Sequence, residues 1–246
     1  MSEKLIDSLI LLSFTLSTFT VFQKLWSIAM NLIRKCKYFI LLFLTFTSCD
    51  KDKIHLVKEV VITFDDAPYP ENTSEVLDIL NEHQVKATFF CIGQSLRMYP
   101  ELTNRIATEQ FLANHTYTHI SVEDSDLTQI FKNEILQTQN LIDSLQPSNK
   151  HYFRPPFGNL SLKQKQTLLN NGFDVVMWDL SAEEWDGNVS TQNVIDYFHK
   201  HLNSGASIPI ILFHLNKSTV ESLEILLTEF EEKNIKVITL DDYKCR

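Results

Sequence analysis

The stretch Val60-Val61-Ile62-Thr63-Phe64-Asp65-Asp66 joins a short apolar run to two adjacent carboxylates. Its β-branched and aromatic residues, with Pro68 two residues after the acids, predict a buried strand that ends at Phe64. Two like charges side by side are costly unless a positive group stabilises them. A metal ion on one carboxylate would do so and leave the other free as a base. The alternative is a turn that carries two solvated acids.

Similar strand patterns recur along the chain and alternate with helical ones. Further strands are predicted at residues 87–92, 111–113, 173–178, 208–213 and 236–240. Most are continuous apolar runs, which are typical of strands covered on both faces. Amphipathic stretches predict helices that begin near Thr73, Asp126, Ser161, Thr191 and Ser218, with Gly205 ending the fourth. This alternation indicates an α/β fold with a mainly parallel sheet, in one catalytic domain over residues 57–246.

The composition describes an acidic globular chain of 246 residues, with 44% hydrophobic and 11% aromatic residues. Such a chain can bury a sizeable core. The formal net charge of -9 argues against non-specific nucleic-acid binding, so we expect no nucleic-acid partner. The four cysteines include no CxxC pair, which argues against a cysteine-based zinc site. We expect Cys91, which lies in an apolar run, to be a core thiol and not to form a disulfide with Cys245.

Residues 1–49 have the pattern of a targeting segment, not of a globular fold. Basic residues within 34–37 precede an apolar run at 38–46, and Thr47-Ser48-Cys49 follows. This order of a basic region, a short apolar region and a small-residue cleavage site is that of a secretory signal.

A cysteine directly after Thr-Ser resembles a bacterial lipoprotein signal. The resemblance implies lipidation at Cys49, a tether over residues 50–56 and membrane anchoring at the cell envelope. Plain secretion and a retained membrane anchor are the alternatives. Because a complete signal begins at Met30, we expect Met30 to be the true start and residues 1–29 to be an extension of the gene model.

The segment His115-Thr116-Tyr117-Thr118-His119 places two histidines four residues apart. On a helical turn, both side chains would lie on one side and reach the same metal ion. With an aspartate they would form a two-histidine, one-carboxylate site with open positions. Such a site suits catalytic Zn and also Fe(II), Co or Mn. The alternative is two unrelated surface or core histidines.

Three later segments carry further candidates. In Phe153–Gly158, two prolines and a glycine fix a loop that either holds Arg154 against a catalytic carboxylate or is a structural turn. In 178–185, an acid could orient a histidine, and the tryptophans are either core residues or a substrate platform. His214 closes the apolar run 210–213, where a general acid or a hydrogen-bonded core histidine would stand.

Taken together and in order, five segments resemble the motifs of the polysaccharide deacetylases, carbohydrate esterase family 4, also called the NodB homology domain. They are TFDDAP (63–68), NHTYTH (114–119), RPPFG (154–158), WDLSAEEW (178–185) and ILFH (211–214). The resemblance covers roughly Val57 to Tyr243. It implies a distorted (β/α) barrel with seven strands, and hydrolysis of N-acetyl groups on an aminosugar polymer with release of acetate.

Three other functions stay open from the sequence. Some family members cleave O-acetyl esters from xylan. A protein that kept the fold and lost the activity would bind glycan without turnover. An unrelated non-haem iron oxygenase would share the two-histidine, one-carboxylate pattern.

The resemblance also implies roles for individual residues. Asp66, His115 and His119 would hold a divalent metal, with Zn2+ expected first and Co2+ as another possibility. Asp65 would be the general base, and Arg154 would pair with Asp65 to keep it ionised and oriented. The metal would polarise the acetyl carbonyl and lower the pKa of a bound water.

The remaining roles fall in the later motifs. The backbone N–H of Phe157 would stabilise the oxyanion, and His214 would protonate the leaving amine. Glu184 would orient His214, and Trp178 and Trp185 would contact the acetylated polysaccharide substrate.

Three positions depart from the family pattern. Ala67 replaces a usual glycine, and the segment 110–113 lacks the usual glycines. Glu184 stands where the family usually has aspartate. Since glutamate is one methylene longer, we expect its hold on His214 to be looser.

Overall fold

The computed structural model describes residues 57–122, 127–186, 188–203 and 208–245, and four residues near the N-terminus (Lys24, Trp26, Ser27 and Met30). By its internal contacts the chain divides into units of residues 1–54 and 55–246. The four described residues of the first unit are helical. The lipidation site Cys49, most of the targeting segment, the whole tether 50–56 and Gly205 lie outside the described residues, so these assignments stay predictions. None of the described helices has the length and apolar character needed to span a membrane.

The second unit is built on a parallel sheet whose strands follow the order β5-β4-β3-β2-β1-β7-β6. The strands are β1 (Glu59–Ala67), β2 (Thr88–Cys91), β3 (Phe111–Asn114), β4 (His151–Phe153), β5 (Phe173–Val175), β6 (Leu180–Ser181) and β7 (Ile210–His214). A further short strand, β8 (Lys236–Val237), pairs with the start of β1 off this path. Among the described residues no pairing joins β5 to β6, so the barrel is open there. The predicted distorted seven-stranded barrel is confirmed.

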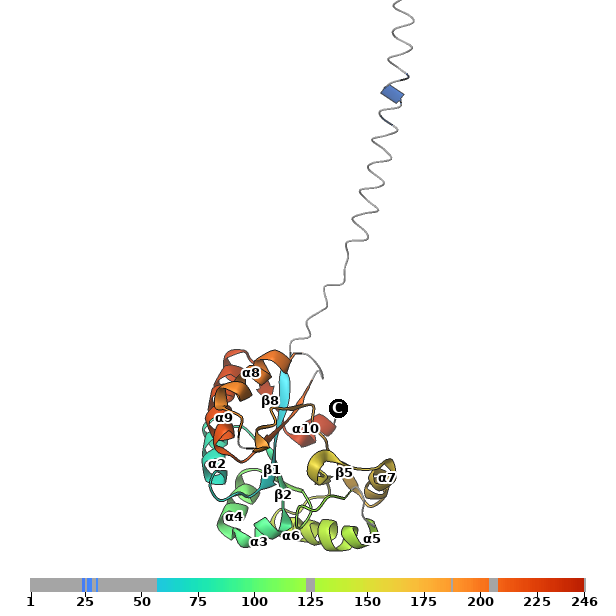
Figure 1. The fold of residues 1–246 in the computed structure, drawn as a ribbon, viewed down its shortest axis with the longest axis vertical. Helices are drawn as coiled ribbons and strands as arrows, with labels where there is room; N and C mark the ends of the chain where they lie inside the picture. The colour runs from blue at the N-terminus through green and yellow to red at the C-terminus, as the bar shows by residue number, and fades with distance from the viewer. Residues whose placement is uncertain are drawn as a thin grey trace, which may run out of the picture. The chain divides into compact units, whose positions relative to one another are not determined.

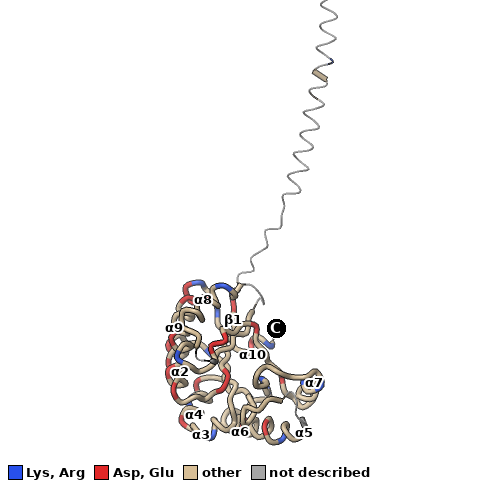
Figure 2. The backbone as a smooth tube through the Cα atoms, viewed as in Figure 1, with Lys and Arg blue, Asp and Glu red and all other residues tan. Residues whose placement is uncertain are grey.

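Helices surround these strands (Figure 1). The α-helices are α2 (Thr73–Glu82), α3 (Gly93–Met98), α4 (Pro100–Glu109), α5 (Leu127–Ile130), α6 (Gln137–Leu145), α7 (Leu162–Asn170), α8 (Thr191–His201), α9 (Lys217–Glu232) and α10 (Leu240–Lys244). Between α5 and α6 the helix widens into a π-helix, η1 (Phe131–Leu136), and two 3₁₀ turns are η2 (Pro156–Gly158) and η3 (Glu184–Asp186). Acidic residues lie along α2 and α9 (Figure 2).

Local capping explains where several helices begin. Ser161 and Gln164 form a reciprocal capping box at the start of α7, so this helix begins next to the predicted start at Ser161. The side chains of Ser190 and Asn216 cap α8 and α9, so these helices begin at or within one residue of the predicted starts. The segment 236–240, predicted as one strand, is divided because the Thr239 side chain caps α10.

The predicted end of the first strand at Phe64 is wrong. β1 continues to Ala67, and Asp65 pairs in register with His214 of β7. Asp65 therefore belongs to the sheet, and its side chain direction follows from strand alternation. Val61, Thr63 and Asp65 lie on one face of β1, and Val60, Ile62 and Phe64 lie on the other.

The outward face of β1 packs against the helices and anchors the strand. The Phe64 ring stacks on Phe89 of β2 at 4.8 Å between centroids and on Phe213 of β7 at 5.8 Å. Fully burying one such side chain contributes about 1.5–3 kcal/mol. Cys91 is a buried free thiol whose pKa is raised by burial, and Cys245 is exposed and free, so the expectation of a core thiol is confirmed.

Candidate active site

Three side chains from two strand ends converge at one point. Asp66 lies near the end of β1, and His115 and His119 follow β3. The distance from Asp66 Oδ1 to His119 Nε2 is 3.2 Å, and the distance to His115 Nε2 is 3.5 Å. One ligand atom from each residue lies within 4.8 Å of the others. The structure therefore brings together the three side chains that the sequence assigns to a metal.

The donor set fits a divalent cation. Asp66 Oδ1 is buried and has no hydrogen-bond partner among the described atoms. His115 Nδ1 lies 2.8 Å from the carbonyl oxygen of Arg154, so Nδ1–H donates and the Nε2 lone pair faces Asp66. Burial lowers the pKa of His115 and outweighs the nearby carboxylates, so this imidazole is neutral as a metal ligand must be. Two imidazole nitrogens and one carboxylate oxygen suit Zn2+ and related metals.

The two histidines do not lie on a helical turn, so that part of the sequence prediction is wrong. Thr116 and His119 have positive φ angles of 65° and 59°. The loop departs from a helix because its carbonyls bind elsewhere: the Thr116 and Tyr117 oxygens accept from Gly93 N and Gln94 N at 2.9 Å each. The four-residue spacing still brings both imidazoles together, through a folded loop.

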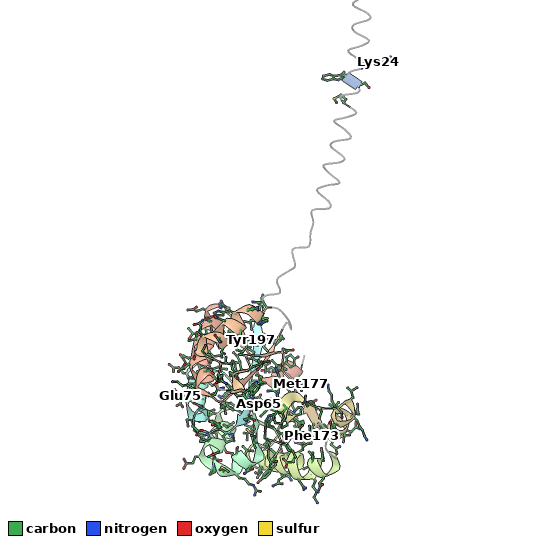
Figure 3. All side chains as sticks on the ribbon, in the orientation of Figure 1. Lys24, Asp65, Glu75, Phe173, Met177 and Tyr197 are labelled. Atoms are coloured by element: carbon green, nitrogen blue, oxygen red, sulfur yellow. The ribbon has the colours of Figure 1, made fainter. Side chains whose placement is uncertain are left out.

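Asp65 is held by a buried arginine. Arg154 Nη1 donates to Asp65 Oδ1 at 2.7 Å and to Thr63 Oγ1 at 3.0 Å. Arg154 is fully buried and Asp65 is 3% exposed. Burial lowers the pKa of Arg154 from its ordinary value, although Asp65 opposes that effect. An arginine remains charged even so, because its ordinary pKa is far above neutral. Figure 3 labels Asp65 within the domain.

The rest of the guanidinium contacts the segment that follows β5. Nε donates to the carbonyl of Val176 at 3.1 Å, and Nη2 donates to that of Met177 at 3.2 Å. The guanidinium carbon lies 4.1 Å from the Phe90 ring centroid and 5.6 Å from that of Trp178. Arg154 therefore connects β1 with the segment between β5 and β6, and Trp178 contributes to its packing.

His214 and Glu184 form a second acid–histidine pair. Glu184 Oε1 accepts from the backbone N–H of His214 at 2.7 Å, whereas the His214 ring Nδ1 lies 3.5 Å from the same oxygen. Glu184 Oε2 is buried without a hydrogen-bond partner among the described atoms. Burial alone would lower the pKa of His214, but Glu184 and the charge of Asp65 outweigh it, so the pKa is raised. The long ring contact agrees with a loose hold by glutamate.

A pocket of about 550 Å³ opens over these groups. Its lining includes Asp65, the three candidate metal ligands (Asp66, His115 and His119) and His214. It also includes Phe157, Trp178, Asp179, Glu183, Trp185 and Tyr197. Phe157 and Trp185 are 65% and 64% exposed, and Trp178 is half-buried. Phe157 and Trp185 are therefore the two aromatic side chains that offer open faces to a ligand.

Backbone strain is concentrated at this pocket. Of the seven described non-glycine residues with positive φ, four line the pocket (Asp66, His119, Phe157 and Glu183), and Thr116 lies buried in the loop between the two histidines. The Phe157 ring packs against the edge of the His119 ring at 4.8 Å between centroids. Each such conformation costs about 1–3 kcal/mol and persists only where the surroundings enforce it.

The structure explains two of the three departures from the family pattern. Ala67 is buried at the end of β1 and is not among the residues with positive φ, so alanine fits where glycine is usual. In the segment without glycines, Gln110 is buried and its Oε1 accepts from Ala87 N at 2.8 Å, which ties β3 to β2.

Sequence reasoning missed three supporting residues. Thr63 shares Arg154 with Asp65, and Asn114 Oδ1 accepts from Thr116 N at 3.0 Å inside the metal loop. Both are part of the motifs quoted above, and their polarity inside apolar strands was the available signal. The third, Glu134, contacts the metal loop from η1, and no local pattern marks it.

The family model for polysaccharide deacetylase matches residues 53–176, just over half of the chain. The chain belongs to this family.

Particular relatives share moderate identity. A peptidoglycan-N-acetylglucosamine deacetylase of Bacillus cereus is 30% identical over 193 residues, covering 74% of this chain and 66% of that protein. Peptidoglycan-N-acetylglucosamine deacetylase PgdA of Listeria monocytogenes is 29% identical over 75% of this chain and 38% of its own length. A chitooligosaccharide deacetylase of Rhizobium leguminosarum bv. trifolii is 31% identical over 64% of this chain and 71% of its own length. The chain thus spans only part of the first two relatives.

Solved structures agree on the fold. A crystal structure of a peptidoglycan N-acetylglucosamine deacetylase matches with a TM-score of 0.69 and 28% identity, over 76% of this chain and 88% of that one. A family pseudoenzyme from Bacillus anthracis also matches with a TM-score of 0.69, at 24% identity over 75% of this chain and 64% of that one. At that identity the likeness shows the fold alone.

Proposed function

We propose that this protein is a metal-dependent hydrolase that removes N-acetyl groups from an aminosugar polymer of the bacterial cell envelope. The observation that carries the proposal is the convergence of three groups on one pocket of about 550 Å³. They are the Asp66–His115–His119 trio, the Asp65–Arg154 pair and the Glu184–His214 pair. Amide hydrolysis needs a Lewis acid, a base and an acid, and each group supplies one.

The metal site and Asp65 prepare the attack. When bound to Asp66, His115 and His119, a divalent cation such as Zn2+ would polarise the acetyl carbonyl and lower the pKa of an adjacent water. Asp65 takes a proton from that water as the oxygen adds to the carbonyl carbon. Arg154 places a positive charge beside the Asp65 carboxylate and holds it in one orientation through the 2.7 Å hydrogen bond.

The second half of the reaction uses the other side of the pocket. The backbone N–H of Phe157, in a turn with a φ of 62°, donates to the developing oxyanion. The C–N bond then breaks, and His214 gives its proton to the leaving amine. The products are acetate and the free amino sugar. Glu184 and Asp65 raise the pKa of His214, which favours the protonated form that this role requires.

The charge of the pocket favours a neutral N-acetylglucosamine unit. Asp179 and Glu183 are exposed carboxylates in the lining, and the described lining residues include no lysine or arginine. A substituent with its own carboxylate, such as that of N-acetylmuramic acid, would meet like charges here. Trp185 is 64% exposed and offers an open ring for stacking on the sugar.

The location is part of the proposal. The order of basic, apolar and small residues before Cys49 supports a lipid anchor at that cysteine and a start at Met30. Mass spectrometry of the native N-terminus tests both: a diacyl modification on Cys49 is expected, and a peptide from residues 1–29 would contradict the start at Met30.

The activity is tested by acetate release from metal-stripped and then Zn- or Co-loaded protein, on chitooligosaccharides and peptidoglycan. Metal-dependent release is expected. Release only from acetylated xylan would identify an O-acetyl esterase. Glycan binding with one bound metal and no release from any substrate would identify a binding protein of the same fold.

A further inference from the structure

We propose that Glu134 is a positioning residue for the metal site, which fixes the loop between His115 and His119 and so sets the affinity for the metal. The inference rests on the proposed metal site. Glu134 is neither among the three candidate ligands nor in the described pocket lining, so it acts through the loop backbone.

One carboxylate binds three donors of this loop. Glu134 Oε2 accepts from the backbone N–H of Tyr117 at 2.9 Å and from that of Thr118 at 2.7 Å. Glu134 Oε1 accepts from the Thr118 hydroxyl at 3.0 Å. These donors lie midway between the two histidines. Hydrogen bonds from several donors to one ionised carboxylate are among the stronger polar contacts in proteins.

The π-helix η1 explains how one helix reaches the loop at neighbouring positions. Besides the Glu134 side chain, the carbonyl of Ile135 accepts from the Asn114 side-chain amide at 2.8 Å. That amide belongs to the residue before His115, and its oxygen binds the Thr116 N–H. A π-turn disturbs the i to i−4 ladder and often occurs at functional sites. Here the π-turn presents two neighbouring acceptors to the metal loop and its start, the Glu134 carboxylate and the Ile135 carbonyl.

The loop needs such support because its conformation is strained. Thr116 and His119 both have positive φ angles, at 65° and 59°. The His119 side chain is about one quarter exposed, so packing alone does not fix it. Without the Glu134 contacts, the loop would sample conformations in which His119 Nε2 lies away from Asp66. The metal would then bind only the fraction of molecules in which the two groups are close together.

The experiment compares Glu134→Ala and Glu134→Gln with wild-type protein, and Asn133→Ala serves as the control. Asn133 is exposed on the same π-helix. Two readouts are taken besides activity. The dissociation constant for Zn2+ is measured by competition with a chromogenic chelator, and hydrogen exchange of the Tyr117 and Thr118 amides is measured on metal-free protein.

We expect Glu134→Ala to weaken Zn2+ binding by about 10- to 100-fold, the usual range for a lost supporting contact. Its Tyr117 and Thr118 amides should lose protection, with the far-UV circular dichroism unchanged. Glu134→Gln keeps an oxygen acceptor, so its affinity should lie between those of wild type and the alanine variant. Asn133→Ala should match wild type in all readouts.

An affinity of Glu134→Ala within twofold of wild type, or unchanged amide protection in that variant, would overturn the inference. If wild type binds no metal, the proposed function fails, whereas the exchange data still report on the loop contact. If the alanine variant does not fold, Glu134→Asp takes its place, because it keeps the charge and withdraws the carboxylate by one methylene.

Discussion

Replacing Arg154 with methionine tests the central buried pair. The side chains of Arg154 and Asp65 are 0% and 4% exposed and meet at 2.7 Å. The substitution leaves the Asp65 carboxylate buried without its cation. Removing one partner of a buried ion pair costs about 3–5 kcal/mol. In a domain of this size, about 1 kcal/mol lowers the Tm by roughly 2–4 °C, so Arg154→Met should lower the Tm by roughly 6–20 °C.

A double-mutant cycle separates the interaction energy of the Asp65–Arg154 pair from the energy of the other contacts of Arg154. Asp65→Asn keeps an oxygen acceptor for Arg154 but removes the charge. The protein with both substitutions contains neither charge, so its loss of stability should be smaller than the sum of the two single losses, by about 0.5–3 kcal/mol. Urea denaturation of metal-free protein measures each term.

The matched control is Arg105→Met. Arg105 also contacts two carboxylates, Asp78 and Glu109, but its side chain is one third exposed. An exposed pair contributes about 0–1 kcal/mol, so this variant should lie close to wild type. If Arg154→Met costs no more than Arg105→Met, the reasoning about the buried pair is wrong.

Four shorter predictions concern the chemistry. Asp65→Asn should abolish acetate release with bound metal retained, and normal activity would refute Asp65 as the base. Asp66→Ala should weaken Zn2+ binding by about tenfold or more, measured by chelator competition, and unchanged binding would remove it from the ligand set. Because the protonated form of His214, favoured by its raised pKa, is the one that acts, kcat should fall as the pH rises through that pKa. Glu184→Gln removes the charge that raises the pKa of His214, so the fall in kcat should occur at lower pH. An unchanged pH profile would contradict the pairing of Glu184 with His214. Glu183→Lys should raise activity on N-acetylmuramic acid units relative to N-acetylglucosamine units, and an unchanged ratio would rule out charge selection there.

The sequence predicts the site better than it predicts the elements that carry it. The acids, histidines and arginine stand in short motifs, and their chemistry limits what they can do together. The strand at 59–67 was predicted too short, because two carboxylates end an apolar pattern. In the folded protein Arg154 satisfies one of these acids, and a strand can then continue through them.

Other features have no local signal. β4 and β6 contain three and two residues, too few to show periodicity. The contact of Glu134 with the Tyr117 N–H spans 17 residues and depends on a π-turn within an otherwise ordinary amphipathic helix. The loop shape at His115–His119 follows from contacts with α3, which the sequence pattern did not reveal.

The edges of β5 and β6 left unpaired in the described part of the chain make Arg154, which lies beside them, important for the fold as well as for the site. Beside these edges, Arg154 donates to the carbonyls of Val176 and Met177, which follow β5, and also to Thr63 and Asp65 of β1. The arginine that orients the base thus also ties β1 to the segment that follows β5. A lineage that loses catalysis but keeps its fold should therefore change a partly exposed ligand such as His119 and retain Arg154. In a set of homologues, a retained arginine would mark an intact barrel, and the partly exposed ligands Asp66 and His119 would separate active from inactive members.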